Sequence, residues 1–513
     1  MNFSIKQSSP CLFVYLGVVF IFLVCSRQAT AGELSFKPSL NISETYTDNL
    51  RLGGGIIGGG GGTGGVGFGL AGAKGGDLIT QINPGVQLTG TGRRYDVNAH
   101  YVMNNLIFAR NSNLTRIRHM LNASANTEVL KDLFFIDGSA RILQQNISPL
   151  GPQTADNVFV TGNRANIEIY SVSPYIRHRF QNVASTELRY TRGIVKSGVN
   201  GFFDSQSDSY QANLNSGDIF GKLGWGLSYS NQMIHMNRVN RTIELERSIA
   251  NFRYNITPRF GITATGGYER NSFVSIRGKP SSPTWTAGFV WAPNKRTDLR
   301  FSAGQRFFGD TYSGAANYRT RLTSWEVLYI EDITTLNQQA GQFGAAGVLS
   351  QFGGLLGQDM LLGLNNFLTN RVFLQRRFNA SVTLNGSRNN LTLSLFQLKR
   401  KPYTAEELDA DLLGFPIFFN NTRQLGGNAS WRYRLSSTMN FNMNFSFIRF
   451  DFLSANRVND NLIFSANVTK DFFPDLIGML QYQRIDRLSN IQAGNQNIDL
   501  SANAVTVSLT KNF

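Results

Sequence analysis

The sequence predicts an all-β fold, a transmembrane antiparallel up-and-down β-barrel of about 20 strands with long extracellular loops. Three observations lead to this prediction. Apolar and polar residues alternate in many segments, a secretory signal stands at the N-terminus, and the chain ends in an aromatic residue, Phe513. Bilayer hydrocarbon offers no partner to an unpaired backbone amide, so strands that cross it must close into a barrel.

Residues 1–32 have the features of a secretory signal peptide. Lys6 precedes an apolar stretch from Cys11 to Cys25, and Ala29-Thr30-Ala31 offers a small-x-small cleavage site. The stretch has about 15 residues, whereas a transmembrane helix needs about 20, which argues against a membrane anchor. Both cysteines of the chain lie in this segment. Residues 33–513, which we expect to form the barrel, therefore offer neither a disulfide nor a cysteine nucleophile.

Alternation is clearest at the C-terminus. Val505, Val507 and Leu509 alternate with small or polar residues ahead of Phe513, which is predicted to end the last strand at the membrane interface and to act as the terminal assembly signal. A soluble β-sandwich or solenoid also has alternating strands, but the signal peptide and the terminal aromatic residue favour a barrel. Other segments with the period of 2 that is typical of strands lie at residues 223–230, 260–268, 299–307, 439–447 and 462–469.

The spacing of these segments sets the size of the barrel. Strand-like segments recur roughly every 20 to 25 residues from Leu34 to Phe513, with turn signals between them. An even number is expected for a single-chain barrel, so we expect about 20 strands, within a range of about 16 to 22. A barrel of this width has a lumen unless something fills it.

Three stretches interrupt the alternation. Residues 53–76 form a glycine-rich tract that predicts an extracellular loop after the first strand. Residues 335–370 carry many apolar side chains without a period of 2, so they are predicted to form either a plug or gate in the lumen or an ordinary extracellular loop. Residues 401–420 form a third, partly acidic long loop. The GxGxxG pattern within the glycine tract lacks the flanking strand and helix of a dinucleotide site.

The charge balance is strongly basic. Without Lys6 and Arg27 of the signal peptide, 47 of the 49 basic residues remain against 33 acids, a net charge of +14. In a membrane barrel this balance does not predict nucleic-acid binding. The arginines are expected either to pair with lumenal carboxylates and touch lipopolysaccharide at the rim, or to line a path for an anionic solute. The candidates for lumen or solute contacts are Arg177, Arg179, Arg259, Arg300 and Arg306.

Catalysis has little support in the sequence. The chain has four histidines and no HxxxH or HExxH spacing, so no metal site and no cofactor site is expected. His100 lies on the same strand face as Asp96 and Asn98, but no partner serine can be identified. We expect the protein not to be an enzyme, and a hydrolase using His100 or His178 remains a remote alternative.

Three segments of the chain have a recognisable pattern: LSFKPSLNISETYTDNLRL, GDLITQINPGVQLTGTGRRYDVNAHY and LTNRVFLQRRFNASVTLNGSRNNLTLSLFQLKRK. They resemble the outer-membrane barrel proteins associated with the PEP-CTERM/exosortase system of Gram-negative bacteria. The similarity extends from Leu34 to Phe513, and the chain departs from the pattern in its long glycine tract and at Lys511, where an aromatic or apolar residue is usual. The resemblance implies a setting of exopolysaccharide synthesis and protein sorting, but no defined functional residues.

Two functions remain open at this stage. The first is a channel or accessory protein through which exopolysaccharide or another anionic solute passes the outer membrane. The second is a non-conducting surface scaffold that retains polymer or sorted proteins. In both cases the expected partners are outer-membrane lipid, lipopolysaccharide and the barrel-assembly machinery, with exopolysaccharide or its secretion proteins as a further expectation.

Overall fold

The computed structural model describes residues 33–52, 75–147, 151–154, 156–198, 204–237, 241–335, 338, 371–404, 421–453, 456–490, 492–493, 496–497 and 499–513. These residues form one sheet of 22 strands and a small two-stranded hairpin. The strands of the large sheet are long, mostly 10 to 17 residues, which suffices to cross a bilayer at a tilt. Among the described residues, no helix has the length and apolar character needed to cross a membrane.

The strands follow one another around the sheet in chain order. They are β1 (Glu33–Thr47), β2 (Asp77–Thr91), β3 (Tyr95–Phe108), β4 (Arg116–Leu130), β5 (Phe134–Asn146), β6 (Arg164–Phe180), β7 (Ala184–Ser197), β8 (Ser205–Ser216), β9 (Leu223–Met236), β10 (Arg241–Thr257), β11 (Phe260–Asn271), β12 (Ser282–Asn294), β13 (Thr297–Arg306), β14 (Gly309–Arg319), β15 (Thr323–Thr334), β16 (Phe373–Asn385), β17 (Asn389–Pro402), β18 (Thr422–Arg434), β19 (Met439–Phe452), β20 (Arg457–Phe473), β21 (Leu476–Ser489) and β24 (Leu500–Asn512). The hairpin consists of β22 (Gln492–Ala493) and β23 (Gln496–Asn497), and two short 3-10 helices are η1 (Ser112–Leu114) and η2 (Asp218–Phe220).

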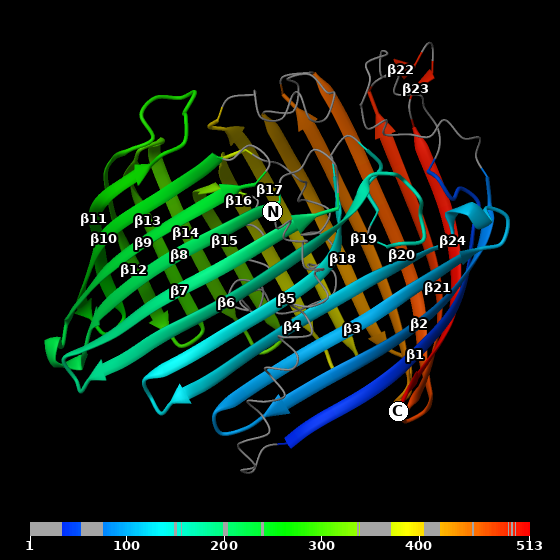
Figure 1. The fold of residues 1–513 in the computed structure, drawn as a ribbon, viewed down its shortest axis with the longest axis horizontal. Helices are drawn as coiled ribbons and strands as arrows, with labels where there is room; N and C mark the ends of the chain where they lie inside the picture. The colour runs from blue at the N-terminus through cyan, green and yellow to red at the C-terminus, as the bar shows by residue number, and fades with distance from the viewer. Residues whose placement is uncertain are drawn as a thin grey trace, which may run out of the picture.

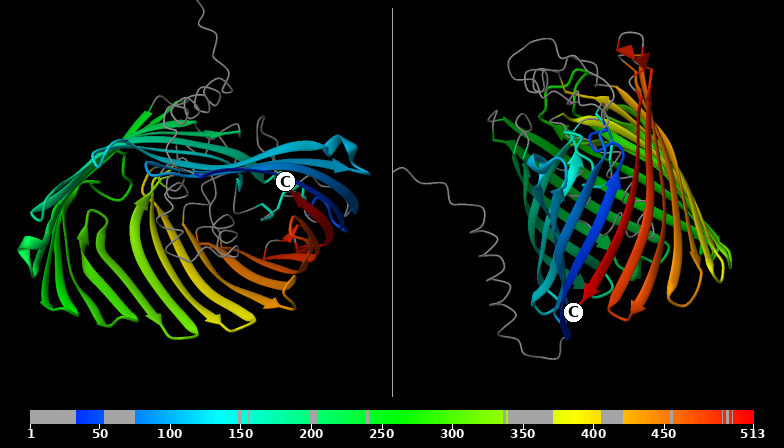
Figure 2. Two further views of the ribbon diagram at one scale, coloured as in Figure 1. Left: turned by 90° about the horizontal axis from the view of Figure 1, so that it is seen from below. Right: turned by 90° about the vertical axis from the view of Figure 1, so that its right-hand side faces the viewer.

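The sheet closes on itself. Each strand pairs antiparallel with its chain neighbours, and β1 also pairs antiparallel with β24, from Ser39 opposite Asn512 to Thr47 opposite Ala504. The result is the barrel of Figures 1 and 2, an elongated ring when seen from below. The predicted all-β barrel is therefore confirmed. Its 22 strands, counted over the described residues, are two more than the expected number and stand at the upper limit of the expected range.

The two ends of the barrel differ. At the end where β1 begins and β24 finishes, short turns connect the strands; we call this the turn end (Figure 1). At the opposite end, the loop end, connections are longer, such as those between β5 and β6 and between β11 and β12. This asymmetry is typical of outer-membrane barrels, whose short turns face the periplasm.

The outer face of the barrel is apolar. In β9, Leu223, Leu227 and Tyr229 are exposed, and in β24 Val505, Val507 and Leu509 are exposed, in agreement with the predicted lipid-facing positions. Exposed aromatic residues gather near the turn end, as in the interfacial girdles of membrane barrels. They include Phe180, Tyr254, Trp291, Tyr318, Phe472, Phe473 and Phe513. A closed barrel with an apolar outer band is the architecture by which strands cross a bilayer.

The end of the chain takes part in the closure. The Phe513 amide donates a hydrogen bond to the Pro38 carbonyl at 2.9 Å, while its ring is exposed. Lys511, the unusual residue near the terminus, forms an ion pair with Asp475 in the turn between β20 and β21. A cation is thus accommodated on the outer face because a carboxylate from the adjacent turn neutralises it.

Several predicted segments lie outside the described residues. They are the signal peptide, almost all of the glycine-rich tract, nearly the whole of the apolar segment 335–370, and residues 405–420 of the third loop. Their predicted roles stay predictions.

Candidate functional site in the lumen

The inner face of the barrel is lined by hydroxyl and amide side chains. Across the seam between β1 and β24, the Thr45 and Thr506 hydroxyls lie 2.9 Å apart, and the Asn41 amide donates to Thr510 at 2.8 Å. The same chemistry continues on β18 to β20, where Asn428 bonds Ser446 and Asn442 bonds Asn467. Side chains that both donate and accept hydrogen bonds make this a wall suited to water and to polar solutes.

One loop folds inward and packs against the far wall. Phe159, in the connection between β5 and β6, is 1% exposed. It belongs to a buried cluster with inward-facing side chains of β17, β19, β20, β21 and β24, five or more strands away from β5 around the ring. The cluster consists of Leu52, Phe159, Phe396, Ile448, Phe450, Phe452, Ile463, Ile485, Leu500, Ala502 and Ala504. We call the described part of this connection, residues 147, 151–154 and 156–163, the inward loop.

A second apolar contact holds the same loop. Val158 packs in a smaller cluster with Leu50, Ile79, Leu106 and Phe108, on the wall formed by β2 and β3. The inward loop therefore contacts two sections of the lumen wall through adjacent residues, Val158 and Phe159. Burial of two such side chains contributes about 1.5–3 kcal/mol each to the seating of the loop.

Hydrogen bonds complete the anchorage of the inward loop. The guanidinium of Arg116 donates to the carbonyls of Asn157 and Phe159 at 3.0 and 3.3 Å, and the Val160 amide donates to the Leu50 carbonyl at 3.0 Å. These bonds satisfy backbone groups that burial has removed from water.

A half-buried aspartate, Asp156, belongs to the same loop. Burial raises the pKa of Asp156 above its ordinary value, although Arg164, the Gln483 side chain and the amides of Val158 and Phe159 all favour the ionised form. The carboxyl group therefore keeps its proton to a higher pH when the loop is seated than when it is in water.

Sequence reasoning missed the inward loop. It considered a plug or gate only in residues 335–370, with an ordinary loop as the alternative, and did not consider the connection between β5 and β6. The available signal was Val158-Phe159-Val160, three apolar residues inside a polar connection. That signal is weak, because so short an apolar run is also typical of a strand.

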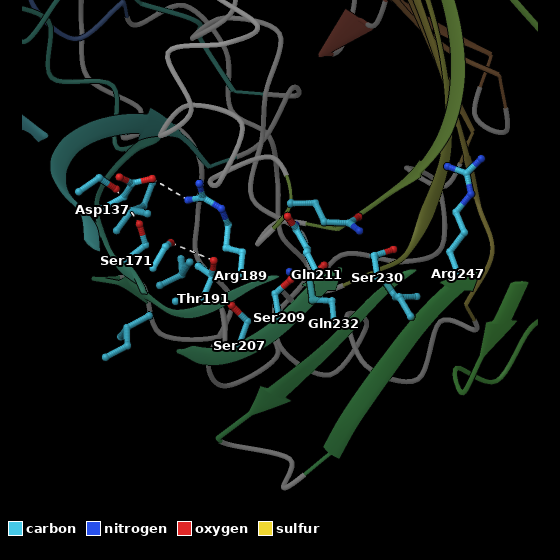
Figure 3. Close-up of a pocket in the computed structure, with 18 of the residues that line it drawn as sticks. Asp137, Ser171, Arg189, Thr191, Ser207, Ser209, Gln211, Ser230, Gln232 and Arg247 are labelled. Atoms are coloured by element: carbon cyan, nitrogen blue, oxygen red, sulfur yellow. Dashed lines mark hydrogen bonds and ion pairs between the residues drawn. The ribbon is translucent and has the colours of Figure 1, made fainter. Parts of the chain in front are cut away.

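The opposite side of the lumen contains a cavity of about 780 Å³. Figure 3 shows the part of its wall that bears Ser171, Thr191, Ser209, Gln211 and Ser230, on successive strands from β6 to β9. Some hydroxyls pair with one another: Ser139 with Ser171 at 2.7 Å, and Ser173 with Thr191 at 2.9 Å. Each hydroxyl still has donor or acceptor capacity for a further partner. The neutral polar residues in the lining are Ser124, Asn126, Ser139, Ser171, Ser173, Thr191, Ser207, Ser209, Gln211, Ser230, Gln232, Asn271 and Gln338.

A charged cluster bounds this wall on one side. Arg189 pairs with Asp137 at 2.6 Å and with Glu187 at 3.1 Å, and Arg177 pairs with Glu187 at 2.9 Å. The Arg189 guanidinium also lies over the Tyr175 ring, 3.8 Å from its centroid. Two carboxylates and an aromatic face hold this arginine in place, so its position in the wall is well defined.

A second charged cluster bounds the other side. Arg306 on β13 pairs with Glu269 at 2.7 Å and with Asp332 at 3.0 Å, and Arg247 on β10 pairs with Glu269 at 3.2 Å. The Glu269 side chain is only 3% exposed. Two arginines share this buried carboxylate, which satisfies its charge and ties β10, β11, β13 and β15 together.

The cavity lining is not basic, despite the charge of the whole chain. Its described residues include three arginines, Arg189, Arg247 and Arg306, against five acids. All three arginines are engaged in ion pairs. The five acids are Asp96, Asp137, Glu246, Glu269 and Asp332. This surface does not favour a polyanion.

The five candidate arginines divide into three groups. Arg177, Arg300 and Arg306 lie on strands and pair with carboxylates, Arg300 with Asp298 at 2.8 Å. Arg179 lies on β6 two residues beyond Arg177, on the same face and close to the turn end. Arg259, the remaining candidate for lumen or solute contacts, does not lie on a strand. It stands in the turn between β10 and β11, since β11 begins at Phe260.

The histidines form no metal site with neighbouring acids. No group of three or more His, Cys, Asp or Glu side chains in the part of the chain that the structure describes could hold a metal ion. His100 lies on β3, four residues from the cavity-lining Asp96 and on the same strand face. His178 stands edge-on to Phe180, with ring centroids 4.6 Å apart.

Comparison with known proteins finds similarity at the level of structure alone. No protein-family model matches the chain, and no curated protein matches it. Among solved structures, the siderophore receptor PirA from Pseudomonas aeruginosa is 9% identical, with 93% of this chain and 80% of that chain covered and a TM-score of 0.44. The FrpB iron transporter from Neisseria meningitidis (F3-3 variant) is also 9% identical, covering 93% and 81%, with a TM-score of 0.48. OccK3 (OpdO) of Pseudomonas aeruginosa is 10% identical, covering 93% and 96%, with a TM-score of 0.32.

Proposed function

We propose that this protein is an outer-membrane channel through which a hydrophilic polymer passes, and that its cargo is an exopolysaccharide in an exosortase setting. One observation carries the proposal: the lumen is divided between the inward loop on one side and a cavity of about 780 Å³ with a polar wall on the other. The resemblance of the sequence to exosortase-associated barrels supports the choice of cargo.

The outer membrane is the site that fits this architecture. A closed barrel with an apolar exterior and an aromatic girdle at the turn end needs a bilayer. The predicted signal peptide provides export across the inner membrane. With the turn end in the periplasm, the inward loop enters the lumen from the cell surface.

The inward loop determines how much of the lumen is open. A barrel of this many strands encloses a wide space. Phe159 fastens the loop to the wall opposite the cavity, and Val158 fastens it to the wall at β2 and β3. The path for a solute therefore runs along β4 to β13, beside the cavity wall. Release of the loop would widen that path.

Single-channel recording in planar bilayers tests the proposal. The purified barrel should conduct, and Phe159→Ala should raise its conductance, because the loop loses the side chain that seats it. Truncation of a buried phenylalanine costs about 3–5 kcal/mol, enough to release a loop. The matched control is Phe180→Ala, an exposed residue near the turn end, which should leave conductance unchanged.

A barrel that is electrically silent in both forms would contradict the channel. It would favour the alternative of a surface scaffold, and cells lacking the protein would then secrete polymer normally but fail to retain it.

A further inference from the structure

We infer that the cavity wall formed by β5 to β10 is a binding site for an uncharged stretch of a saccharide chain. The inference rests on the proposed function and deepens it, because it names the chemical class that the channel wall recognises. It also replaces the anionic solute expected from the arginine count with a neutral, hydroxyl-rich ligand.

The polar side chains stand in rows that run across the strands. In one row the strand register places Arg189 opposite Gln211, Gln211 opposite Ser230, and Ser230 opposite Arg247. Figure 3 shows this row, with the two arginines at its ends and the amide and hydroxyl between them. Neighbouring strands lie about 4.8 Å apart, close to the length of one pyranose ring, so successive sugar units would meet successive strands.

A second row lies further toward the loop end. It contains Ser139 opposite Ser171, Ser171 opposite Gly193, and Gly193 opposite Ser207. A Cβ atom on Gly193 would stand 2.6 Å from the Ser207 hydroxyl oxygen. The Ser207 hydroxyl therefore occupies the space that a side chain at position 193 would need, so glycine lets this hydroxyl lie close against the wall.

The chemistry of the rows matches hydroxyl groups. A sugar hydroxyl both donates and accepts hydrogen bonds, as do Ser, Thr and Gln side chains. The arginines that bound the wall are held by Asp137 and Glu269, so they can donate remaining N–H groups without presenting an unbalanced positive charge. A carboxylated or phosphorylated chain would gain little here, because the three arginines of the described lining already pair with carboxylates and the acids outnumber them.

Two neutral substitutions on the wall test the site. The double variant Gln211→Leu/Ser230→Ala removes the central groups of the first row and keeps both arginines. The probe is maltohexaose, added during single-channel recording, with tetragalacturonate as the anionic comparison. The control is Thr383→Val on β16, an inward hydroxyl residue outside the cavity lining, 3.3 Å from Thr392.

Maltohexaose should interrupt the current of the wild-type and Thr383→Val channels, and the double variant should bind it roughly tenfold more weakly, the effect of losing about one or two hydrogen bonds. Calorimetry on the detergent-solubilised barrel measures the same affinity without conduction.

A conducting barrel that binds no maltohexaose overturns the saccharide site and leaves the channel standing. Tighter binding of tetragalacturonate, or equal binding by the double variant and wild type, also overturns it. A silent barrel that binds maltohexaose by calorimetry supports the site while the channel fails.

Discussion

Asp156 shows how one residue can set the behaviour of the lumen. Its carboxyl group lies in the inward loop, where it accepts a hydrogen bond from the Val158 amide at 3.1 Å, and burial raises its pKa from the ordinary value of 3.8. A carboxyl group whose pKa is higher in the seated loop binds its proton more tightly there. Seating is therefore most stable below the ordinary pKa, and its stability falls as the pH rises toward the raised pKa.

This linkage predicts a channel that opens as pH rises. As the pH rises from the ordinary pKa of 3.8 through the raised pKa, the wild-type conductance should increase, because ionisation of Asp156 costs more in the seated loop than in water. Asp156→Asn cannot ionise and should show a flat profile over the same range, with the conductance that wild type has at low pH. Conductance recorded in symmetric salt at each pH provides the measurement, and parallel profiles for the two proteins would assign the pH response to other groups.

At the scale of single strands, β13 carries two arginines with opposite surroundings. The Arg306 side chain is 10% exposed and pairs with the buried Glu269, whereas the Arg300 side chain is 65% exposed and pairs with the partly exposed Asp298. A buried pair that loses one partner leaves a charge without compensation, while an exposed pair exchanges its partner for water. The same residue type on the same strand therefore has two different energetic roles.

Arg306→Leu should lower the free energy of unfolding by about 3 kcal/mol, because Glu269 then keeps only Arg247 as a cationic partner. Arg300→Leu, the matched control, should change it by less than about 1 kcal/mol. Urea titration of the detergent-folded barrel, followed by tryptophan fluorescence, gives both values. Equal losses in the two variants would show that burial does not distinguish these arginines.

The sequence predicted well which residues form strands and face lipid. It predicted only some of the residues that line the lumen. The alternation with period 2 identifies which side chains of β9 or β24 face lipid, because one face of each strand contacts lipid and the other faces the polar lumen. It also placed Arg300 and Arg306 on the inner face. It could not place Arg259, since a shift of one or two residues at a strand boundary moves a side chain from a strand into a turn. The inward loop was missed because its partners, such as Phe450 and Ile485, are distant in sequence.

The number of strands depends on how many residues separate the start of one strand from the start of the next. We expected about 20 from a repeat of roughly 20 to 25 residues. The strands β12 to β15 begin at residues 282, 297, 309 and 323, a shorter repeat, since β13 and β14 have only 10 and 11 residues. Only residues 307 and 308 separate these two strands. Short strands with short connections at this point account for the higher number.

Closure of the ring depends on the pairing of β1 with β24, the strands nearest the two ends of the sequence. Thr45 and Thr506 stand directly opposite each other in that register, and their hydroxyl oxygens lie 2.9 Å apart inside the lumen. Directly opposed residues of antiparallel strands have Cβ atoms within about 5.5 Å, and a disulfide needs about 3.5–4.5 Å. Since both natural cysteines lie in the predicted signal peptide, an engineered pair would have no competing thiol in residues 33–513.

The double variant Thr45→Cys/Thr506→Cys should therefore form a disulfide on mild oxidation of the folded barrel. After boiling in detergent, the oxidised chain should migrate faster on a gel than the reduced chain. The disulfide closes a covalent loop that contains most of the chain and so makes the denatured protein more compact. The control Thr45→Cys/Val507→Cys places the second thiol on the lipid-facing side of β24 and should remain reduced, since neighbouring residues of a strand point to opposite faces. Cross-linking of the control, with none in the test pair, would mean that β24 meets β1 in a register shifted by one residue. That shift would turn Val505, Val507 and Leu509 into the lumen and remove the apolar band by which the last strand crosses the membrane.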